Sequence, residues 1–261
     1  MKLASQEGLV PGKTLAEKLD NLATYGYQGI EFWGGGLENR QDEIIRATEN
    51  HLVKPSTICA GYPGCLLDGN RSERDKAIEG IRTLLKVAAN IGAVGLIMVP
   101  IFGGPRINDL SPYKNARQLE VELLVALLKD LGGYAEEVGS IILVEPLNRY
   151  ETHFIKTLND GVEICKQVSS PNVAIMADFF HMSIEERNIA ESIEAAGSYI
   201  KHVHLADSTR QLPGYGHTDF KSGFAALKQI GYQNYMALEC GVPGPGEIEL
   251  PKSAQYMKAW I

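Results

Sequence analysis

Eight short apolar segments rich in β-branched residues alternate with eight longer stretches that carry apolar residues at helical spacing, to the end of the sequence. Each pair of segments occupies roughly 32 residues, the size of a βα unit in a closed barrel. Some short segments are apolar throughout, as in Ile141-Ile142-Leu143-Val144, which is typical of parallel strands covered on both faces. We therefore predict an α/β fold, a (β/α)8 TIM barrel, with residues 1–261 forming a single domain.

The predicted strands are Lys2–Ser5, Gly29–Trp33, Ser56–Ala60, Val94–Pro100, Ile141–Glu145, Val173–Asp178, Ile200–Leu205 and Tyr235–Glu239. The predicted helices are Thr14–Tyr25, Gln41–His51, Ser72–Ile91, Ala116–Val138, Leu158–Val168, Glu186–Ala196, Phe220–Ile230 and Glu247–Ala259. Two connections, Gly61–Arg71 and Gly103–Asn115, are longer than the rest and are expected to cover the mouth of the barrel. A doubly wound open sheet is the alternative, but no strand is followed by a GxGxxG or GxxxxGK(S/T) nucleotide-binding fingerprint.

Composition argues against several classes of function. The 261 residues carry a formal net charge of -7, which disfavours nucleic acid as a partner. No apolar run approaches the roughly 18 residues that span a bilayer, and the N-terminal segment lacks the apolar core of a secretory signal. We therefore expect a cytoplasmic protein with no membrane partner. The four cysteines lie far apart without a CxxC pair, which argues against a zinc knuckle and a disulfide scaffold.

Ligand-type side chains stand at the ends of the last four predicted strands: Glu145, Asp178, His204 and Glu239. In a barrel these strand ends meet at one face, where active sites of this architecture lie. Three carboxylates in one cavity repel one another unless a cation neutralises them. Three oxygens and one imidazole favour a hard divalent ion such as Mn²⁺, Mg²⁺ or Co²⁺ over a thiolate-bound zinc. His202 shares a face with His204, but His204 is nearer the tip and is the expected ligand.

At these positions the sequence resembles a known family. The segments that carry the resemblance are Glu145-Pro146-Leu147-Asn148-Arg149-Tyr150-Glu151, Asp178-Phe179-Phe180-His181-Met182, His204 followed by Arg210, Glu239 and, in the first half, Gly26-Tyr27-Gln28-Gly29-Ile30-Glu31. They are similar to the sugar isomerases and epimerases among the xylose isomerase-like TIM barrels. The greatest similarity is to the ketose 3-epimerases typified by the D-tagatose and D-psicose enzymes.

The resemblance implies a metal-dependent epimerase that inverts C3 of a ketose or keto-acid sugar through an enediolate, which a bound cation stabilises. The implied ligands of the single divalent metal are Glu145, Asp178, His204 and Glu239. Mn²⁺ is the expected ion, with Co²⁺, Mg²⁺ and Zn²⁺ as alternatives. Glu145 and Glu239 would also form the catalytic acid/base pair, on opposite faces of the reacting carbon. The implied substrate-binding residues are Glu151, His181 and Arg210, and the implied assembly is a homodimer or homotetramer.

Several alternatives stay open at the level of sequence. Return of the proton to the adjacent carbon would make an aldose-ketose isomerase similar to hydroxypyruvate isomerase, and loss of a β-hydroxyl would make an inosose dehydratase. A non-catalytic sugar-binding barrel is more remote because the ligand residues are intact. An endonuclease IV-like nuclease is also more remote, because the histidines that this nuclease places at the ends of strands three and four are missing here. His217 and Asp219 would form a second metal site with His181, or Asp219 would cap the following helix. Phosphorylation of the sugar is also open.

Overall fold

The computed structural model describes all 261 residues and contains a closed barrel of eight strands in sequence order. The strands are β1 (Lys2–Gln6), β2 (Gly29–Trp33), β3 (Lys54–Cys59), β4 (Leu96–Met98), β5 (Ile142–Val144), β6 (Val173–Asp178), β7 (Ile200–Leu205) and β8 (Tyr235–Leu238). Every neighbouring pair is parallel, and β1 pairs with β8 to close the barrel. The predicted fold class is therefore confirmed.

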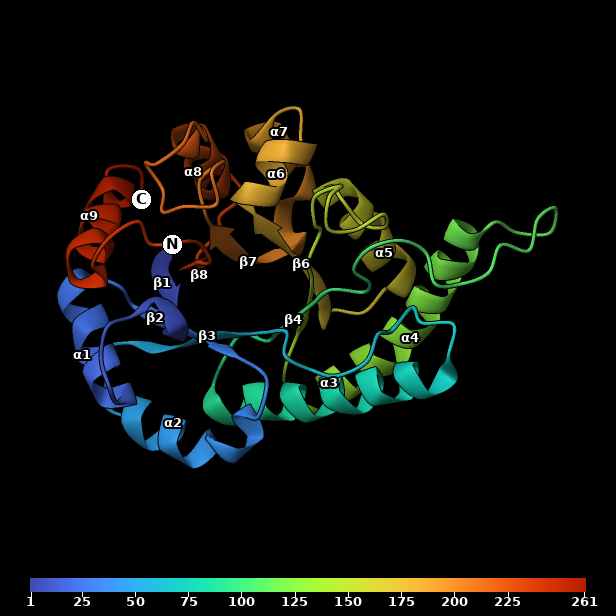
Figure 1. Ribbon diagram of the computed structural model, residues 1–261, viewed down its shortest axis with the longest axis horizontal. Helices are drawn as coiled ribbons and strands as arrows, with labels where there is room; N and C mark the ends of the chain where they lie inside the picture. Colours follow the sequence, from blue (N-terminus) through green and yellow to red (C-terminus); the bar gives the residue numbers. More distant parts are fainter.

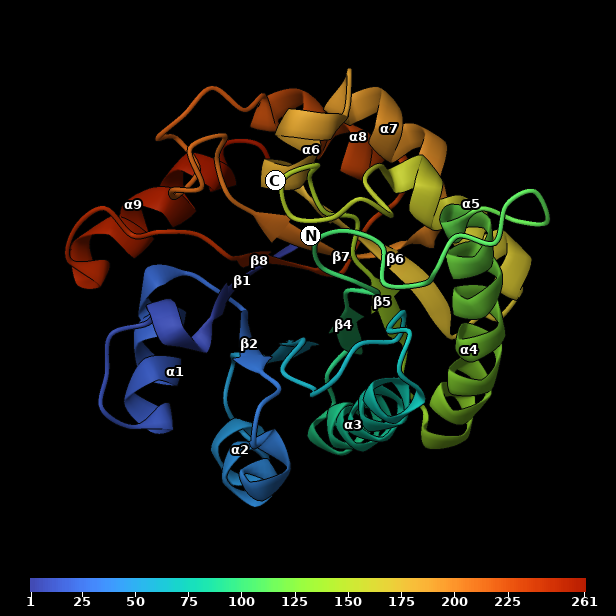
Figure 2. The same ribbon diagram turned by 45° about the vertical axis from the view of Figure 1, so that its right-hand side comes forward.

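Helices surround the strands (Figure 1). They are α1 (Leu15–Tyr25), α2 (Gln41–Thr48), α3 (Arg71–Ile91), α4 (Ala116–Val138), α5 (Leu158–Val168), α6 (Phe179–Glu185), α7 (Ile189–Ala196), α8 (Phe220–Gln229) and α9 (Gly246–Lys258). Figure 2 shows the same ring turned by 45°, with α3 and α4 packed side by side. None of the helices is both long and apolar enough to cross a membrane.

Local signals in the sequence set most helix ends. Thr14 and Thr157 open α1 and α5 with capping boxes, in which the threonine side chain accepts a hydrogen bond from the backbone of the third helical residue. Gly92 and Gly139 end α3 and α4 in the left-handed conformation, with φ of 74° and 76°, which favours glycine. Because these signals are local, the predicted helices agree closely with the observed ones.

The structure contains one α-helix that the sequence pattern does not predict. Helix α6 begins directly after β6, where the Asp178 side chain accepts a hydrogen bond of 2.7 Å from a backbone N–H of the first turn. Its 7 residues are too few to show a helical period. The helix predicted over Glu186–Ala196 begins later, at Ile189. This additional turn of helix carries His181 at the mouth of the barrel.

The barrel interior has an apolar part and a polar part. A cluster of 60 buried residues packs the barrel against its helices, and a separate cluster of 5 lies inside the barrel on β3 to β6. On the side of β1, β2 and β7 the interior is polar, and its buried residues include Ser5, Glu31, His202 and His204. Since strand residues alternate between faces, His202 and His204 point the same way. The polar part of the interior therefore continues from the floor of the barrel toward its mouth.

Candidate active site

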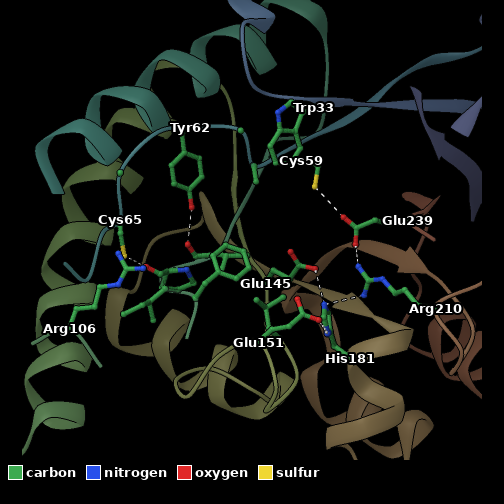
Figure 3. A pocket seen from close by; sticks show the side chains of 18 residues that line it. Trp33, Cys59, Tyr62, Cys65, Arg106, Glu145, Glu151, His181, Arg210 and Glu239 are labelled. Carbon is green, nitrogen blue, oxygen red and sulfur yellow. Dashed lines mark hydrogen bonds and ion pairs between the residues drawn. The ribbon is translucent and has the colours of Figure 1, made fainter. Parts of the chain in front are cut away.

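A cavity of about 340 Å³ opens at the mouth of the barrel (Figure 3). Its wall is apolar where Trp33, Tyr62 and Phe102 contribute, and the connections after β3 and β4 both take part in it. The expectation that these long connections cover the mouth agrees with this arrangement. The charged and imidazole side chains on the opposite side are Glu145, Glu151, His181, Arg210 and Glu239.

The ends of four strands bring potential metal ligands together. Asp178 is the last residue of β6, His204 lies one residue before the end of β7, and Glu145 and Glu239 directly follow β5 and β8. One ligand atom of each lies within 4.8 Å of the others. Glu145, Asp178 and His204 are almost completely buried, at 5%, 1% and 0% exposure. We call these four residues the ligand group.

The arrangement of His204 fits a cation in the ligand group. Its Nδ1 atom is buried and makes no hydrogen bond. This atom lies 3.2 Å from Glu239 Oε2, 3.7 Å from Glu145 Oε1 and 3.8 Å from Asp178 Oδ2. A buried imidazole nitrogen that faces three carboxylates without a partner is what a divalent ion with mixed oxygen and nitrogen ligands requires.

The pKa values of two carboxyl groups in the ligand group shift in opposite directions. Burial, together with the negative charges of Glu239 and Asp178, raises the pKa of Glu145 well above its ordinary value. Burial acts in the same direction on Glu239, but the His204 imidazole and the Arg210 guanidinium outweigh it and lower the pKa of Glu239. The opposite shifts show that three carboxyl groups are too close together to ionise independently, and a divalent cation would stabilise all three as carboxylates.

Arg210 is placed by the loop between β7 and α8. The carboxylate of Asp207 organises this loop by accepting hydrogen bonds of 2.8, 2.8 and 3.0 Å from three of its backbone N–H groups. Arg210 adopts a left-handed backbone conformation, with φ of 57°. Its guanidinium donates to Glu239 and, at 3.2 Å, to Asp178 Oδ2. Arg210 thus lies beside two members of the ligand group.

His181 has a defined orientation in the cavity wall. Its Nδ1 atom accepts hydrogen bonds from the backbone N–H of Asn148 at 3.2 Å and from the Asn148 side-chain amide at 2.8 Å. The proton of the neutral ring is therefore on Nε2, which lies 3.6 Å from Asp178 Oδ2 and 3.3 Å from Arg210 Nη1. The same Asn148 amide donates to Glu151 Oε1 at 2.8 Å. His181 and Glu151 are therefore held together at the edge of the ligand group.

Of the polar residues beneath the ligand group, sequence reasoning named His202 as a neighbour of His204 but gave Glu31 and Gln6 no role. Glu31 on β2 is fully buried and lies 3.0 Å from His204 Nε2 and 2.9 Å from His202 Nε2. Gln6 on β1 donates to Glu31 at 3.1 Å and to Glu239 at 3.0 Å. Glu31 did carry a signal, because it is a charged residue between the apolar Ile30 and Phe32 in a predicted buried strand.

The structure does not bring His217 and Asp219 together with His181. The potential ligand clusters are the ligand group and a second set formed by Glu31, Cys59 and His204. Asp219 accepts a hydrogen bond of 3.1 Å from the backbone N–H of Ser222 and caps α8. His217 is exposed. The geometry therefore supports the helix-cap interpretation of Asp219 and gives no support to a second metal site at these residues.

Replacing Asp219 by alanine is expected to destabilise the protein by about 1 kcal/mol, the usual effect of removing a helix cap. In a chain of this size the thermal midpoint should fall by about 2–4 °C. Metal stoichiometry should not change in either Asp219→Ala or His217→Ala, because neither residue belongs to the ligand group. Calorimetric metal titration and thermal unfolding of both variants check this. Loss of one metal equivalent in either variant would instead support a second metal site that includes the substituted residue.

Comparisons with known proteins agree with this geometry. The sequence matches the family described as "Xylose isomerase-like TIM barrel" over residues 19–260. It is 31% identical to the 3-dehydro-D-guloside 4-epimerase of Escherichia coli K12, with 100% of this chain and 99% of that protein covered. It is 34% identical to the D-psicose 3-epimerase of Agrobacterium fabrum, with 88% and 80% covered. The crystal structure of 3-keto-D-glucoside 4-epimerase from E. coli superposes with a TM-score of 0.89 at 28% identity, covering 99% of both chains.

Proposed function

This chain belongs to the xylose isomerase-like TIM barrel family, and on that premise we propose that it is a divalent-metal-dependent epimerase of keto sugars. Relatives that are at least 31% identical and aligned over 88% or more of this chain place it in the sugar epimerase and isomerase class of enzymes. The proposed reaction inverts a carbon next to the ketone, at C3 of a ketose or keto-acid sugar. The observation that carries the proposal is the pair Glu145 and Glu239, two carboxylates that reach one cavity from strand ends far apart on the barrel.

The proposed metal ligands are Glu145, Asp178, His204 and Glu239, which fit a divalent ion through the unpartnered Nδ1 of His204 and the close approach of three carboxyl groups. The ion would supply Lewis-acid stabilisation of the negative charge that develops on the ketone oxygen when the neighbouring carbon loses its proton. We propose Mn²⁺, with Co²⁺, Mg²⁺ and Zn²⁺ as alternatives, because the donors are hard oxygens with one imidazole.

The two glutamates would move the proton. Between β5 and β8 lie β6 and β7 on one side and the other four strands on the other side, so Glu145 and Glu239 approach the cavity from different directions. A substrate carbon between them would give its proton to one carboxylate and receive a proton from the other on the opposite face. Removal of the proton on one face and its return on the other inverts the configuration of the carbon. Such general acid–base catalysis typically contributes 10²–10⁴-fold to the rate.

Three further side chains would bind and orient the sugar. His181 presents its Nε2–H to the cavity because Asn148 holds Nδ1, and it would donate a hydrogen bond to a substrate oxygen. Arg210 carries a fixed positive charge beside Asp178 and Glu239 and would donate to an oxygen near the reacting carbon. Glu151 lines the cavity and would accept a hydrogen bond from a hydroxyl group.

The relative that is aligned over its whole length favours a second substrate class. That enzyme is named for the 4-position of a 3-dehydro-guloside, which is again the carbon next to a ketone. The same pair of glutamates would serve a 3-keto sugar at C4 and a 2-keto sugar at C3. Which class this chain accepts is a question of how the sugar sits in the cavity and not of a different chemistry.

Solvent deuterium exchange tests the proposal. Metal-free protein is incubated in D2O with and without added Mn²⁺, Co²⁺, Mg²⁺ or Zn²⁺, together with 2-keto sugars, keto-acid sugars and 3-keto glycosides, and carbon-bound deuterium is followed by NMR. We expect metal-dependent exchange at the carbon next to the ketone, with appearance of the epimer. Exchange at C1 with an aldose as product would show an isomerase, and loss of water a dehydratase. Tight metal binding without any deuterium exchange would favour a sugar-binding barrel that has no catalytic activity.

A further inference from the structure

A single buried carboxylate, that of Glu31, underlies the ligand group. It is fully buried and accepts hydrogen bonds from Gln6 at 3.1 Å and from Thr57. His202 Nε2 lies 2.9 Å from Glu31 Oε2. His204 Nε2 lies 3.0 and 3.1 Å from its two oxygens. Gln6 and Thr57 donate to Glu31, and an ionised carboxylate can only accept, so a hydrogen bond to either histidine requires a proton on its Nε2.

The two nitrogens of His204 have different surroundings. Nε2 faces Glu31 alone, while Nδ1 faces the carboxylates of the ligand group and has no hydrogen bond. We propose that Glu31 is a positioning residue that keeps the proton of neutral His204 on Nε2, so that Nδ1 presents its lone pair to a divalent cation. This inference rests on the metal dependence contained in the proposed function. A carboxylate that fixes the tautomer of a ligating histidine commonly contributes 10–100-fold to metal affinity.

Gln6 extends the effect of Glu31 to a second member of the ligand group. Its side-chain amide donates to Glu31 Oε1 at 3.1 Å and to Glu239 Oε1 at 3.0 Å. One amide thus ties the buried carboxylate to the glutamate proposed as acid or base. Because β1 pairs with β8, Gln6 and Glu239 meet only when the barrel closes. Glu31 and Gln6 therefore orient both His204 and Glu239 from below.

The alternative for Glu31 is a metal site of its own with Cys59 and His204. The contacts argue against it, since the oxygens of Glu31 are already occupied by four donors. Burial and the neighbouring carboxylates also raise the pKa of the Cys59 thiol, which keeps its proton and donates to Glu239 Oε1 at 3.5 Å. Glu31 and Cys59 are thus both already engaged in hydrogen bonds to other side chains. One metal equivalent is therefore expected, not two.

The first test is the affinity of the sugar-free protein for Mn²⁺, measured by isothermal titration calorimetry. Glu31→Gln keeps the size of the side chain but replaces one acceptor oxygen by an N–H donor, which cannot accept the hydrogen bonds that the carboxylate receives. Because His204 would then lose its fixed orientation, we expect Mn²⁺ affinity to fall about 10–100-fold. Glu120→Gln is the matched control, because Glu120 is also fully buried and paired with a histidine, His153, outside the ligand group. Affinity in the control should match that of the unmodified protein.

A second measurement needs no variant and therefore does not depend on how Glu31→Gln folds. In ¹⁵N-labelled protein titrated with diamagnetic Zn²⁺, we expect the ¹⁵N NMR signals of His204 to show Zn²⁺ on Nδ1 and a proton on Nε2. Zn²⁺ on Nε2, or two bound Zn²⁺ per chain, would overturn the inference in favour of the Glu31 and Cys59 site.

The outcomes separate this inference from the proposed function. Equal Mn²⁺ affinity in Glu31→Gln and the unmodified protein would refute the positioning role of Glu31 without contradicting the proposed epimerase function. Weakened Mn²⁺ binding in a protein that exchanges no deuterium into any sugar would keep the role of Glu31 and reject the epimerase. A protein that binds no divalent metal at all would reject both.

Discussion

Replacing Glu145 or Glu239 by glutamine is expected to lower the rate of epimerisation by about 10⁴-fold, the upper range for loss of a positioned acid or base. Glutamine has nearly the same shape as glutamate, but its amide neither takes up nor delivers the proton. Its carbonyl oxygen remains available as a metal ligand. The measurement is kcat/KM for both directions of the reaction, with metal content determined on the same samples.

Deuterium exchange makes this prediction sharper, because each glutamate serves one face of the reacting carbon. A variant that has lost one of the two should still remove and return the proton on the remaining face. One epimer would then exchange its hydrogen with D2O without inverting, while the other would be inert. We expect the exchanging epimer to be opposite in Glu145→Gln and Glu239→Gln.

The controls for these variants are metal content and the fold. Both proteins should bind one metal equivalent and unfold cooperatively, since the substitutions leave the barrel core unchanged. Appreciable inversion by either variant would contradict the two-carboxylate scheme. Exchange of the same epimer by both would assign the chemistry to a single base, and the remaining glutamate would then be a metal ligand only.

The fold could be predicted from the sequence because its signals are local. The alternation of apolar strands and amphipathic helices is visible in windows of about 11–18 residues, and caps such as Thr14 and Thr157 mark where helices begin. Helix α6 escaped prediction because 7 residues contain too little periodicity. Its start depends on Asp178, a residue whose role as a potential ligand was more apparent than its role as a cap.

The ligand group was also accessible from sequence, for a topological reason. Parallel strands in a closed barrel all end at the same mouth, so a carboxylate or imidazole at the end of a strand is placed by the fold itself. Glu145, Asp178, His204 and Glu239 all occupy such positions. His181 and Arg210 do not, and only the resemblance to a family pointed to them.

The support beneath the ligand group could not be predicted in the same way. Glu31 lies in the middle of β2, and its partners come from three other strands: Gln6 from β1, Thr57 from β3, and His202 and His204 from β7. No local pattern couples these positions. Only the closure of the barrel and the alternation of strand residues bring them to one point, so their role emerges from three-dimensional contacts.

Asp178 serves two structures at once, and Asp178→Asn separates them. Oδ1 caps α6 by accepting the backbone N–H of Phe180 at 2.7 Å, whereas Oδ2 faces His204 Nδ1 at 3.8 Å and Arg210 at 3.2 Å. Asparagine retains the capping oxygen and replaces the other with an N–H donor, which is no metal ligand. We expect metal affinity to fall at least about 100-fold, because loss of an outer hydrogen-bond partner alone costs 10–100-fold.

Thermal unfolding with and without Mn²⁺ measures this loss directly. Metal at about 100 times its dissociation constant should stabilise the unmodified protein by about 2.7 kcal/mol. The same concentration should stabilise Asp178→Asn by less than about 0.5 kcal/mol, since it would no longer exceed the weakened dissociation constant. Asp219→Asn is the matched control, because Asp219 also caps a helix but lies outside the ligand group, and it should respond to Mn²⁺ like the unmodified protein. Full stabilisation of Asp178→Asn by Mn²⁺ would remove Asp178 from the ligand set and leave it with the capping role alone.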